Sequence, residues 1–311
     1  MTELQGYRTP AAVSSAIAAA AKRANTFDDS LSVDEYMRLE YFNRFLSRVF
    51  HDQRDTSWVL KGGTSMLARV ATARATRDVD LYHQGPSLEA SVAELRRLAA
   101  IDLGDFFRFE YRDRAPSLNG AWSGSVEGCT VRFDVYLGAK KLTALKVDLA
   151  RNVVVTGDID PAVPASALDI PKLVSNPYRL YPVVDQIADK VCATVSRYGQ
   201  QSSSREKDLV DLVILANTVT VGASQLEVAL RTEAVARGLQ LSTRFELPES
   251  WGRVYEAEAS RIPACAAHRT IHAAAALMAK FIDPVMNGDV RNEMWHPETL
   301  QWEYPNNTIS R

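Results

Sequence analysis

Two aspartates, Asp78 and Asp80, have the side-chain type and the spacing that could bind a metal ion. In Asp78-Val79-Asp80-Leu81-Tyr82 the acidic and apolar residues alternate, which predicts a strand with both carboxylates on one face. A divalent cation with oxygen ligands relieves the repulsion between two such carboxylates, and Mg²⁺ (or Mn²⁺) is the usual ion beside phosphates. An Asp-x-Asp pair also occurs by chance on solvated strand edges, so it needs support from its neighbours.

A glycine pair precedes these aspartates in the sequence. Residues 58–60 are apolar and predict a short strand, and residues 65–73 predict a helix. The Lys-Gly-Gly-Thr segment between them lets backbone N–H groups approach an anion, because glycine has no side chain in the way. The following helix directs its positive N-terminal end to the same place. A tight turn without function is the alternative, but together with the aspartates the segment predicts a metal–triphosphate site, with the nucleotide-binding candidates Lys61, Gly62, Gly63 and Thr64.

A third carboxylate on a neighbouring strand would complete a two-metal site. Asp148 lies in the alternating segment of residues 145–149 and is the preferred candidate, whereas Asp134 in residues 130–136 is the second. The sequence does not separate them firmly, because either could be a strand residue that faces solvent.

The second half of the chain contributes three further candidates, Lys190, Asp208 and Asp211. The two aspartates lie three residues apart and share a helix face, where their like charges need a cationic partner such as Lys190 or Arg205. Structural ion pairing explains this pattern as well as a catalytic role does.

The elements that must position these residues change in type along the chain. Residues 11–22, 33–51 and 89–100 have helical periodicity, and the segments between residues 106 and 149 alternate as strands do. After residue 177 the alternation fades, and helical patterns cover residues 183–198, 205–216, 223–237 and 271–281. We therefore predict an α/β domain with N-terminal helices in residues 1–170 and a helical domain in residues 171–311.

Composition limits the class of protein. The chain has 311 residues, 46% of them hydrophobic and 24% charged, which is typical of globular proteins, and its net charge of −2 excludes a molecule that is basic throughout. No segment approaches the ~20 apolar residues that span a bilayer, and the alanine-rich N-terminus lacks the basic start of a signal peptide. We expect a cytoplasmic protein without membrane contact, whose three distant cysteines are buried packing residues.

Four motifs occur in an order that resembles a known family. They are Leu60-Lys61-Gly62-Gly63-Thr64, Thr76-Arg77-Asp78-Val79-Asp80-Leu81, Ala188-Asp189-Lys190 and Lys207-Asp208-Leu209-Val210-Asp211-Leu212. Over residues 35–290 the chain is similar to the AbiEii/AbiGii toxin-type nucleotidyltransferases, the group that includes the MenT toxins. The family implies a polymerase-β-like nucleotidyltransferase domain with a mixed sheet, of α/β (α+β) class, joined to a C-terminal helical domain.

The resemblance also implies an activity and roles for residues. Such toxins belong to toxin–antitoxin pairs, so a cognate antitoxin is expected. Those of the MenT type transfer a nucleotide from an NTP such as ATP or CTP to the 3′ end of tRNA and so block aminoacylation. Asp78 and Asp80 would then hold Mg²⁺, Lys190 would contact the triphosphate, and Asp211 would be the essential acidic residue. Position 78 is Asp where some relatives have Ser, which leaves the number of bound metals open.

The acceptor is the least determined part of this prediction. An RNA acceptor needs a cationic approach, for which Arg74 and Arg77 beside the acidic pair are the candidates. A protein or a small molecule could be the acceptor at the same site. A non-catalytic module that binds NTP and a partner is a third interpretation, although the intact Asp78, Asp80 and Lys190 argue against it.

Overall fold

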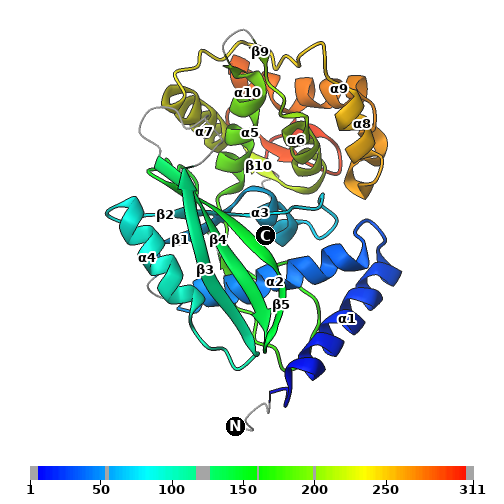
Figure 1. Cartoon of the computed structure of the whole chain (residues 1–311). Coiled ribbons are helices and arrows are strands. Elements are labelled where there is room, and N and C mark those ends of the chain that lie inside the picture. The colour runs from blue at the N-terminus through cyan, green and yellow to red at the C-terminus, as the bar shows by residue number, and fades with distance from the viewer. Residues whose placement is uncertain (1–5, 53–55, 117–126, 160, 199–200, 306–311) are drawn as a thin grey trace, which may run out of the picture. The chain divides into compact units, whose positions relative to one another are not determined.

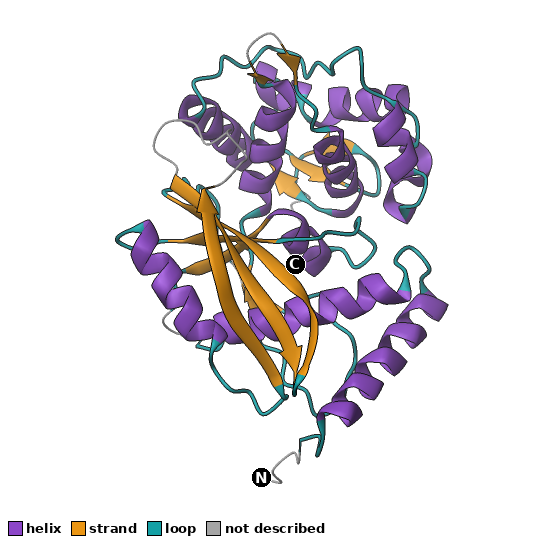
Figure 2. Ribbon diagram, in the orientation of Figure 1, coloured by secondary structure: helices purple, strands orange, loops and turns teal. Residues whose placement is uncertain are grey.

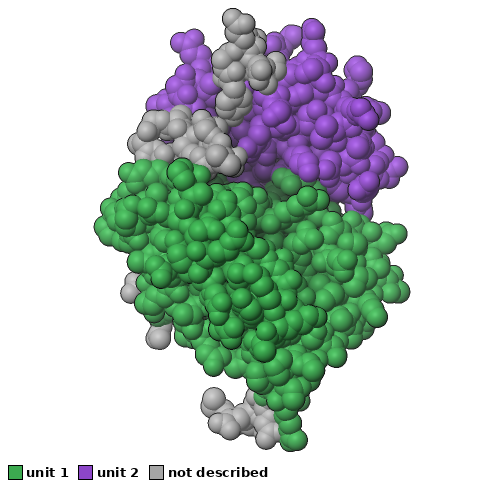
Figure 3. Space-filling view, viewed as in Figure 1, with its two compact units in different colours: residues 1–153, 159–181 green, residues 154–158, 182–311 purple. Residues whose placement is uncertain are grey.

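The chain divides into two compact units. The computed structural model describes residues 6–52, 56–116, 127–159, 161–198 and 201–305. Unit 1 consists of Met1–Val153 and Ile159–Tyr181, and unit 2 consists of Val154–Asp158 and Pro182–Arg311 (Figure 3). Residues 171–181, which we expected in the helical half, therefore belong to unit 1.

Unit 1 contains a five-stranded mixed sheet with the strand order β1-β2-β5-β4-β3 (Figure 1). Strands β2 and β5 run parallel, and the other neighbours run antiparallel. This sheet confirms the expected α/β class with a mixed sheet. The strands are β1 (Trp58–Lys61), β2 (Val79–His83), β3 (Phe107–Pro116), β4 (Glu127–Leu137) and β5 (Lys140–Arg151).

Alternation along the strands gives the sheet one buried face and one open face. On β4 the side chains of Val131, Phe133 and Val135 are buried. On the other face, those of Arg132, Asp134 and Tyr136 are partly exposed. Helix α2 packs on the buried face through Phe45, whose ring lies 5.3 Å from those of Phe109 and Phe133. Helix α4 covers β3 and β4 on the same side (Figure 2). The helices of unit 1 are α1 (Pro10–Phe27), α2 (Val33–Val49), α3 (Gly62–Arg69) and α4 (Leu88–Ala99).

The segment between β1 and β2 differs from the expectation in two places. We predicted a turn over residues 61–64 and a helix over residues 65–73, but α3 begins at Gly62, directly after β1. Gly62 has a φ of 60°, which glycine adopts at no steric cost, so the chain passes from strand to helix without a loop. Asp78, which we predicted as a strand residue, lies in a bend immediately before β2.

The second segment of unit 1, Ile159–Tyr181, extends the β1 edge of the sheet. Strands β6 (Pro161–Ala162) and β7 (Tyr178–Arg179) form a short antiparallel pair. Leu180 forms a parallel bridge with Leu60, and the Tyr181 N–H donates to the Leu60 carbonyl at 2.9 Å. These contacts explain why unit 1 continues to Tyr181.

Unit 2 is mainly helical, as predicted. Its small sheet of order β10-β11-β12 was not predicted, because its strands contain only two or three residues each. The helices are α5 (Val183–Val195), α6 (Glu206–Thr218), α7 (Ala223–Ala236), α8 (Arg253–Ala259), α9 (Ile271–Phe281) and α10 (Asp283–Asn287), with a 3₁₀ helix η1 (Pro263–His268). The strands are β8 (Arg197–Tyr198), β9 (Gln201–Ser202), β10 (Val221–Gly222), β11 (Met294–His296) and β12 (Gln301–Glu303).

One buried carboxylate fixes the short segment Val154–Asp158 within unit 2. Asp185, in the first turn of α5, is 4% exposed. It accepts hydrogen bonds from the N–H and the hydroxyl of Thr156 and from the N–H of Gly157, at 2.6–3.1 Å. These bonds satisfy the buried charge, so Asp185 stabilises this segment.

Two further expectations concern the whole chain. None of the helices in the described part of the chain is both long and apolar enough to cross a membrane. The three cysteines are buried free thiols, as expected for packing residues, and burial raises the pKa of Cys192 to about 12.

Candidate active site

Asp80 and Asp148 lie side by side on the two parallel strands at the centre of the sheet. Their Cα atoms are register partners between β2 and β5, so the two side chains point to the same face. Asp148 is 7% exposed and Asp80 is partly exposed. The structure therefore brings together two of the three predicted metal-binding carboxylates.

Gly62 makes room for the carboxylate of Asp80. A Cβ atom at Gly62 would lie 1.9 Å from Asp80 Oδ2, a distance that no side chain could tolerate. The first turn of α3 thus begins against this carboxylate, which places the positive end of the helix beside the acidic site. Gly62 was predicted as part of a phosphate cradle, and its close contact with Asp80 is a requirement that the sequence did not reveal.

Asp78 is held next to the same site by two threonine hydroxyls. Thr64 Oγ1 donates to the Asp78 carbonyl at 2.9 Å, and Thr76 Oγ1 lies 3.2 Å from Asp78 Oδ1. Gly63 permits this arrangement, because a Cβ there would lie 2.8 Å from Thr76 Oγ1. The hydroxyl of Thr64 therefore orients the loop that carries Asp78.

Lys146 is a site residue that we missed in the sequence. Its ammonium lies 2.6 Å from Asp148 Oδ2 and 3.5 Å from Asp78 Oδ2, and Thr130 Oγ1 donates to Asp148 Oδ1 at 2.6 Å. Partial burial disfavours the charged lysine, but its contacts with Asp148 and Asp78 outweigh this and raise the pKa of Lys146. The signal was present in Lys146-Val147-Asp148, because strand residues two apart share a face.

Asp134, the alternative third carboxylate, lies elsewhere on the sheet. It is opposite Ala144 on β5, four residues from Asp148, a separation of about 13 Å along the strand. Its carboxylate pairs with Lys141 at 2.6 Å. The structure thus places Asp148, and not Asp134, beside Asp80.

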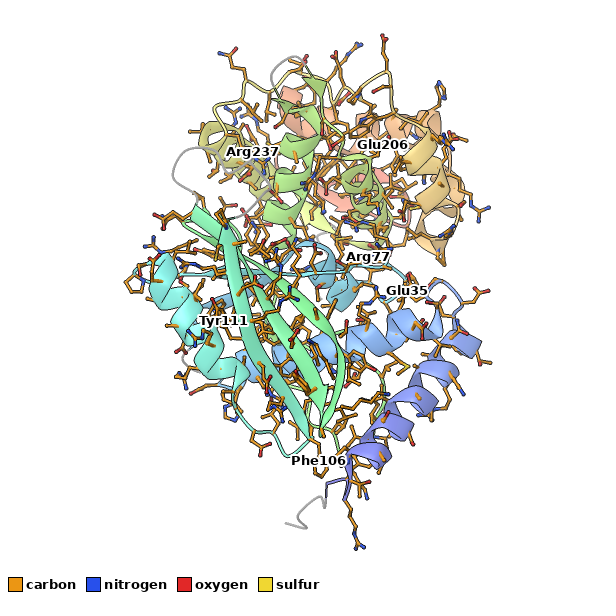
Figure 4. The ribbon with its side chains drawn as sticks, in the orientation of Figure 1. Glu35, Arg77, Phe106, Tyr111, Glu206 and Arg237 are labelled. Atoms are coloured by element: carbon orange, nitrogen blue, oxygen red, sulfur yellow. The ribbon has the colours of Figure 1, made fainter. Side chains whose placement is uncertain are left out.

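The predicted cationic residues of unit 1 lie between the end of β1 and the start of β2, as Asp78 does. Lys61 is the register partner of Asp80 across β1 and β2, and its ammonium lies 4.3 Å from the ring centre of Tyr181. Arg74 and Arg77 lie in the loop that leads to Asp78, and Arg77 is exposed. Figure 4 labels Arg77 and also Glu35, which lies in the first turn of α2. Burial opposes the charged form of Glu35, but hydrogen bonds with Ser32 and, to a smaller extent, the charges of Arg38 and Arg77 lower its pKa.

The carboxylates of this site fit a divalent cation when water or a substrate supplies the further ligands. No three His, Cys, Asp or Glu side chains among the described residues form a metal-binding group by themselves. Mg²⁺ is nevertheless commonly bound by one or two carboxylates together with substrate phosphates and water. The position of the Lys146 ammonium, in contact with Asp78 and Asp148, shows that these carboxylates attract a cation.

The remaining predicted residues form a buried ion-pair cluster in unit 2. Lys190 on α5 contacts Asp208 at 3.0 Å and Asp211 at 2.6 Å, both on α6, and its side chain is 5% exposed. Arg205 contacts Asp208 at 2.5 Å. Burial alone would raise the pKa of Asp208, but Lys190 and Arg205 lower it to about 2.

Neighbouring charges extend this cluster to other helices of unit 2. Asp189, which precedes Lys190, pairs with Arg237 at the end of α7. Glu206 in the first turn of α6 accepts hydrogen bonds from the N–H groups of Gly252 and Tyr255 at the start of α8 (Figure 4). The Asp189-Lys190 motif and the α6 motif therefore connect α5, α6, α7 and α8 through charged contacts.

The match to one family model agrees with the resemblance seen in the motifs. The model of the family described as the nucleotidyl transferase AbiEii toxin of a type IV toxin–antitoxin system matches residues 44–290. No curated protein sequence matches the chain significantly.

Solved structures with partial similarity include MenT4, the nucleotidyltransferase toxin Rv2826c from Mycobacterium tuberculosis H37Rv. It is 14% identical with a TM-score of 0.49, and the match covers 92% of this chain and 100% of that one. JHP933 from Helicobacter pylori is 17% identical with a TM-score of 0.38, covering 67% of this chain and 81% of that one. Because the family model spans most of the sequence, the chain belongs to the AbiEii nucleotidyltransferase toxin family.

Proposed function

We propose that this toxin transfers a nucleoside monophosphate from an NTP to the 3′ end of tRNA and so blocks aminoacylation. The observation that carries the transferase chemistry is the pairing of Asp80 with Asp148 on adjacent parallel strands, with Asp78 and the start of α3 beside them. This arrangement offers the carboxylates of Asp78 and Asp80 to a cation and the positive end of a helix to a phosphate.

The reaction joins the terminal 3′ oxygen of the RNA to the α-phosphorus of the NTP, and pyrophosphate leaves. Asp78 and Asp80 hold Mg²⁺ or Mn²⁺ in this proposal, and that ion supplies neutralising charge for the triphosphate. Gly62 and Gly63 let the N–H groups of α3 approach a phosphate. Because the hydroxyl of Thr64 donates a hydrogen bond to the Asp78 carbonyl, Thr64 positions the loop that carries Asp78.

Lys190 contacts the triphosphate in this proposal only after a change in its pairing. Its ammonium must leave Asp208, whose charge remains paired with Arg205 at 2.5 Å. Asp211, 2.6 Å from Lys190, then keeps the lysine in place. The catalytic assignment of Lys190 and Asp211 is therefore testable separately from that of Asp80.

The RNA acceptor binds through phosphate contacts in this proposal. Arg77 is exposed and Arg74 is partly exposed, and both precede Asp78 in the same loop. Contacts of this kind make binding strongly dependent on salt, because bound counterions are released. A cytoplasmic location and a cognate antitoxin complete the proposal, and the type IV toxin–antitoxin family supports the antitoxin.

The test is a transfer assay with each α-labelled NTP, Mg²⁺ and total tRNA. Label is expected on RNA with the wild type and is expected to disappear with Asp80→Ala. Asp134→Ala is the matched control, because this carboxylate lies on the same sheet but pairs with Lys141. Periodate-oxidised tRNA, which lacks the 3′-terminal diol, identifies the acceptor group.

Each other outcome selects a different function. Label that resists nuclease and migrates with protein indicates a protein acceptor, and label on a small compound indicates a small-molecule acceptor. Labelling of oxidised tRNA at the level of intact tRNA contradicts transfer to the 3′ end. NTP binding without transfer to any acceptor supports a non-catalytic module.

A further inference from the structure

One carboxylate oxygen of Asp148, Oδ2, contacts the positively charged side chain of Lys146. Lys146 Nζ lies 2.6 Å from Asp148 Oδ2, and Thr130 Oγ1 donates to Asp148 Oδ1 at the same distance. Both oxygens of Asp148 therefore have close partners, and its side chain is only 8% exposed. With both oxygens engaged and little exposure to solvent, Asp148 has no oxygen open to a metal ion unless one of these partners moves.

The same ammonium also reaches the carboxylate on the other side of the site. Lys146 Nζ lies 3.5 Å from Asp78 Oδ2, so one positive charge is shared between Asp78 and Asp148. In a two-metal site a divalent ion would occupy such a position between carboxylates. Lys146 supplies a positive charge there from strand β5 itself, at any metal concentration.

We propose that Lys146 replaces one of the two metal ions of a nucleotidyl-transfer site, so that the chain binds a single divalent cation through Asp78 and Asp80 and none through Asp148. The proposal rests on the proposed function for the metal-binding role of Asp78 and Asp80. It makes Lys146 a positioning residue, which acts by holding Asp148 and by neutralising the charge of the site.

The experiment counts Mn²⁺ ions bound to the full chain without nucleotide, from the electron paramagnetic resonance signal of free Mn²⁺. The wild type is expected to bind one ion that is lost in Asp80→Ala. Lys146→Met is expected to bind a second ion, because Asp148 loses its ammonium partner, and Lys146→Met/Asp148→Asn is expected to return to one. Lys146→Arg keeps a cation and should bind one ion.

Two variants serve as controls for this count. Lys141→Met removes the other ion-paired lysine of β5, which contacts Asp134 at 2.6 Å, and should leave the count at one. Asp148→Asn in the otherwise wild-type chain should also leave one ion with unchanged affinity, which tests the proposal even if Lys146→Met does not fold.

Several results would overturn the proposal. These are two ions in the wild type, a tenfold loss of Mn²⁺ affinity in Asp148→Asn, a single ion in folded Lys146→Met, and the absence of any ion that depends on Asp80. Failure of the proposed function is a separate result: a chain that binds one ion as described but labels no tRNA contradicts the tRNA assignment and leaves the role of Lys146 intact.

Discussion

Each unit of the molecule contains a lysine between two aspartates, and the two clusters differ mainly in their exposure to solvent. In unit 1 Lys146 contacts Asp78 and Asp148, and its side chain is 42% exposed. In unit 2 Lys190 contacts Asp208 and Asp211, and its side chain is 5% exposed. The same three charged groups therefore occur once at an open site and once inside a helical layer.

This difference predicts different consequences of losing the lysine. An exposed ion pair contributes little to stability, because water solvates the charges when the pair is broken. A buried pair that loses one partner leaves a charge in a poorly polar environment, which is strongly destabilising. Loss of activity in a Lys190 variant can therefore result from instability alone, whereas loss in a Lys146 variant is easier to assign to the site.

The largest effect is expected for Lys190→Met. This substitution leaves Asp211, which is fully buried, without its 2.6 Å partner, and we expect it to lower the free energy of unfolding by about 3–5 kcal/mol. Urea unfolding followed by circular dichroism measures this change. Lys207→Met on α6, the helix that carries Asp211, is the control. The side chain of Lys207 is 55% exposed in its pair with Glu258, so its loss should cost at most ~1 kcal/mol. Equal effects of the two substitutions would show that burial does not distinguish the clusters.

The next effect concerns the backbone beside the open cluster. Gly62→Ala should reduce the rate of nucleotide transfer on the order of a hundredfold, because the new Cβ would lie 1.9 Å from Asp80 Oδ2 and must displace it by more than an ångström. Gly104→Ala introduces a side chain at a similar φ of 68° with nothing within 4 Å. A similar loss in both variants would attribute the effect to backbone strain and not to displacement of Asp80.

A smaller effect is expected in the dependence of stability on pH. The pKa of Asp208 is lowered to about 2 in the folded chain, so its contribution to stability is complete above about pH 4. That contribution, about 2 kcal/mol, is lost as the pH falls from about 4 to 2, because the unfolded chain takes up the proton first. Unfolding free energies of the wild type and Asp208→Asn should therefore differ at pH 5 and converge towards pH 2. A constant difference would contradict the assigned ion pairs.

The smallest effect is expected for Lys146→Met. Its side chain is partly exposed and Asp148 keeps its 2.6 Å bond from Thr130, so the free energy of unfolding should fall by at most ~1 kcal/mol. The same urea experiment measures it. A loss as large as that of Lys190→Met would show that the open cluster has a structural role comparable to that of the buried one.

The main lines of the fold could be predicted because local patterns agree with it. Alternation over residues 130–136 and 145–149 predicted the two longest strands, and helical periodicity predicted α1, α2 and α4 in unit 1 and α5, α6, α7 and α9 in unit 2. The shorter helices α8 and α10 were not predicted. The preference for Asp148 over Asp134 was also made from the sequence, although the strand register that supports it is a long-range property. Strands β10–β12 escaped prediction, because two- and three-residue strands carry no detectable period.

The details of the site depend on contacts that no local pattern encodes. The requirement for Gly62 comes from Asp80, 18 positions later in the chain. The pairing of Lys190 with Asp208 and Asp211 was one expectation from the sequence, but its burial was not predicted, because most lysines on helices are exposed. Lys146 differs from these cases, because its spacing of two residues from Asp148 already places both side chains on one face of a strand.

The hydrogen bonds of Asp185 to residues 156 and 157 affect how the protein can be dissected. Because Val154–Asp158 belongs to unit 2 while Ile159–Tyr181 belongs to unit 1, the chain passes between the units three times. A single cut at residue 170 would remove the Leu180 bridge from β1 and leave Asp185 on the other fragment from Thr156. The two units are therefore interlaced in sequence, and neither consists of one continuous segment that a single cut would release.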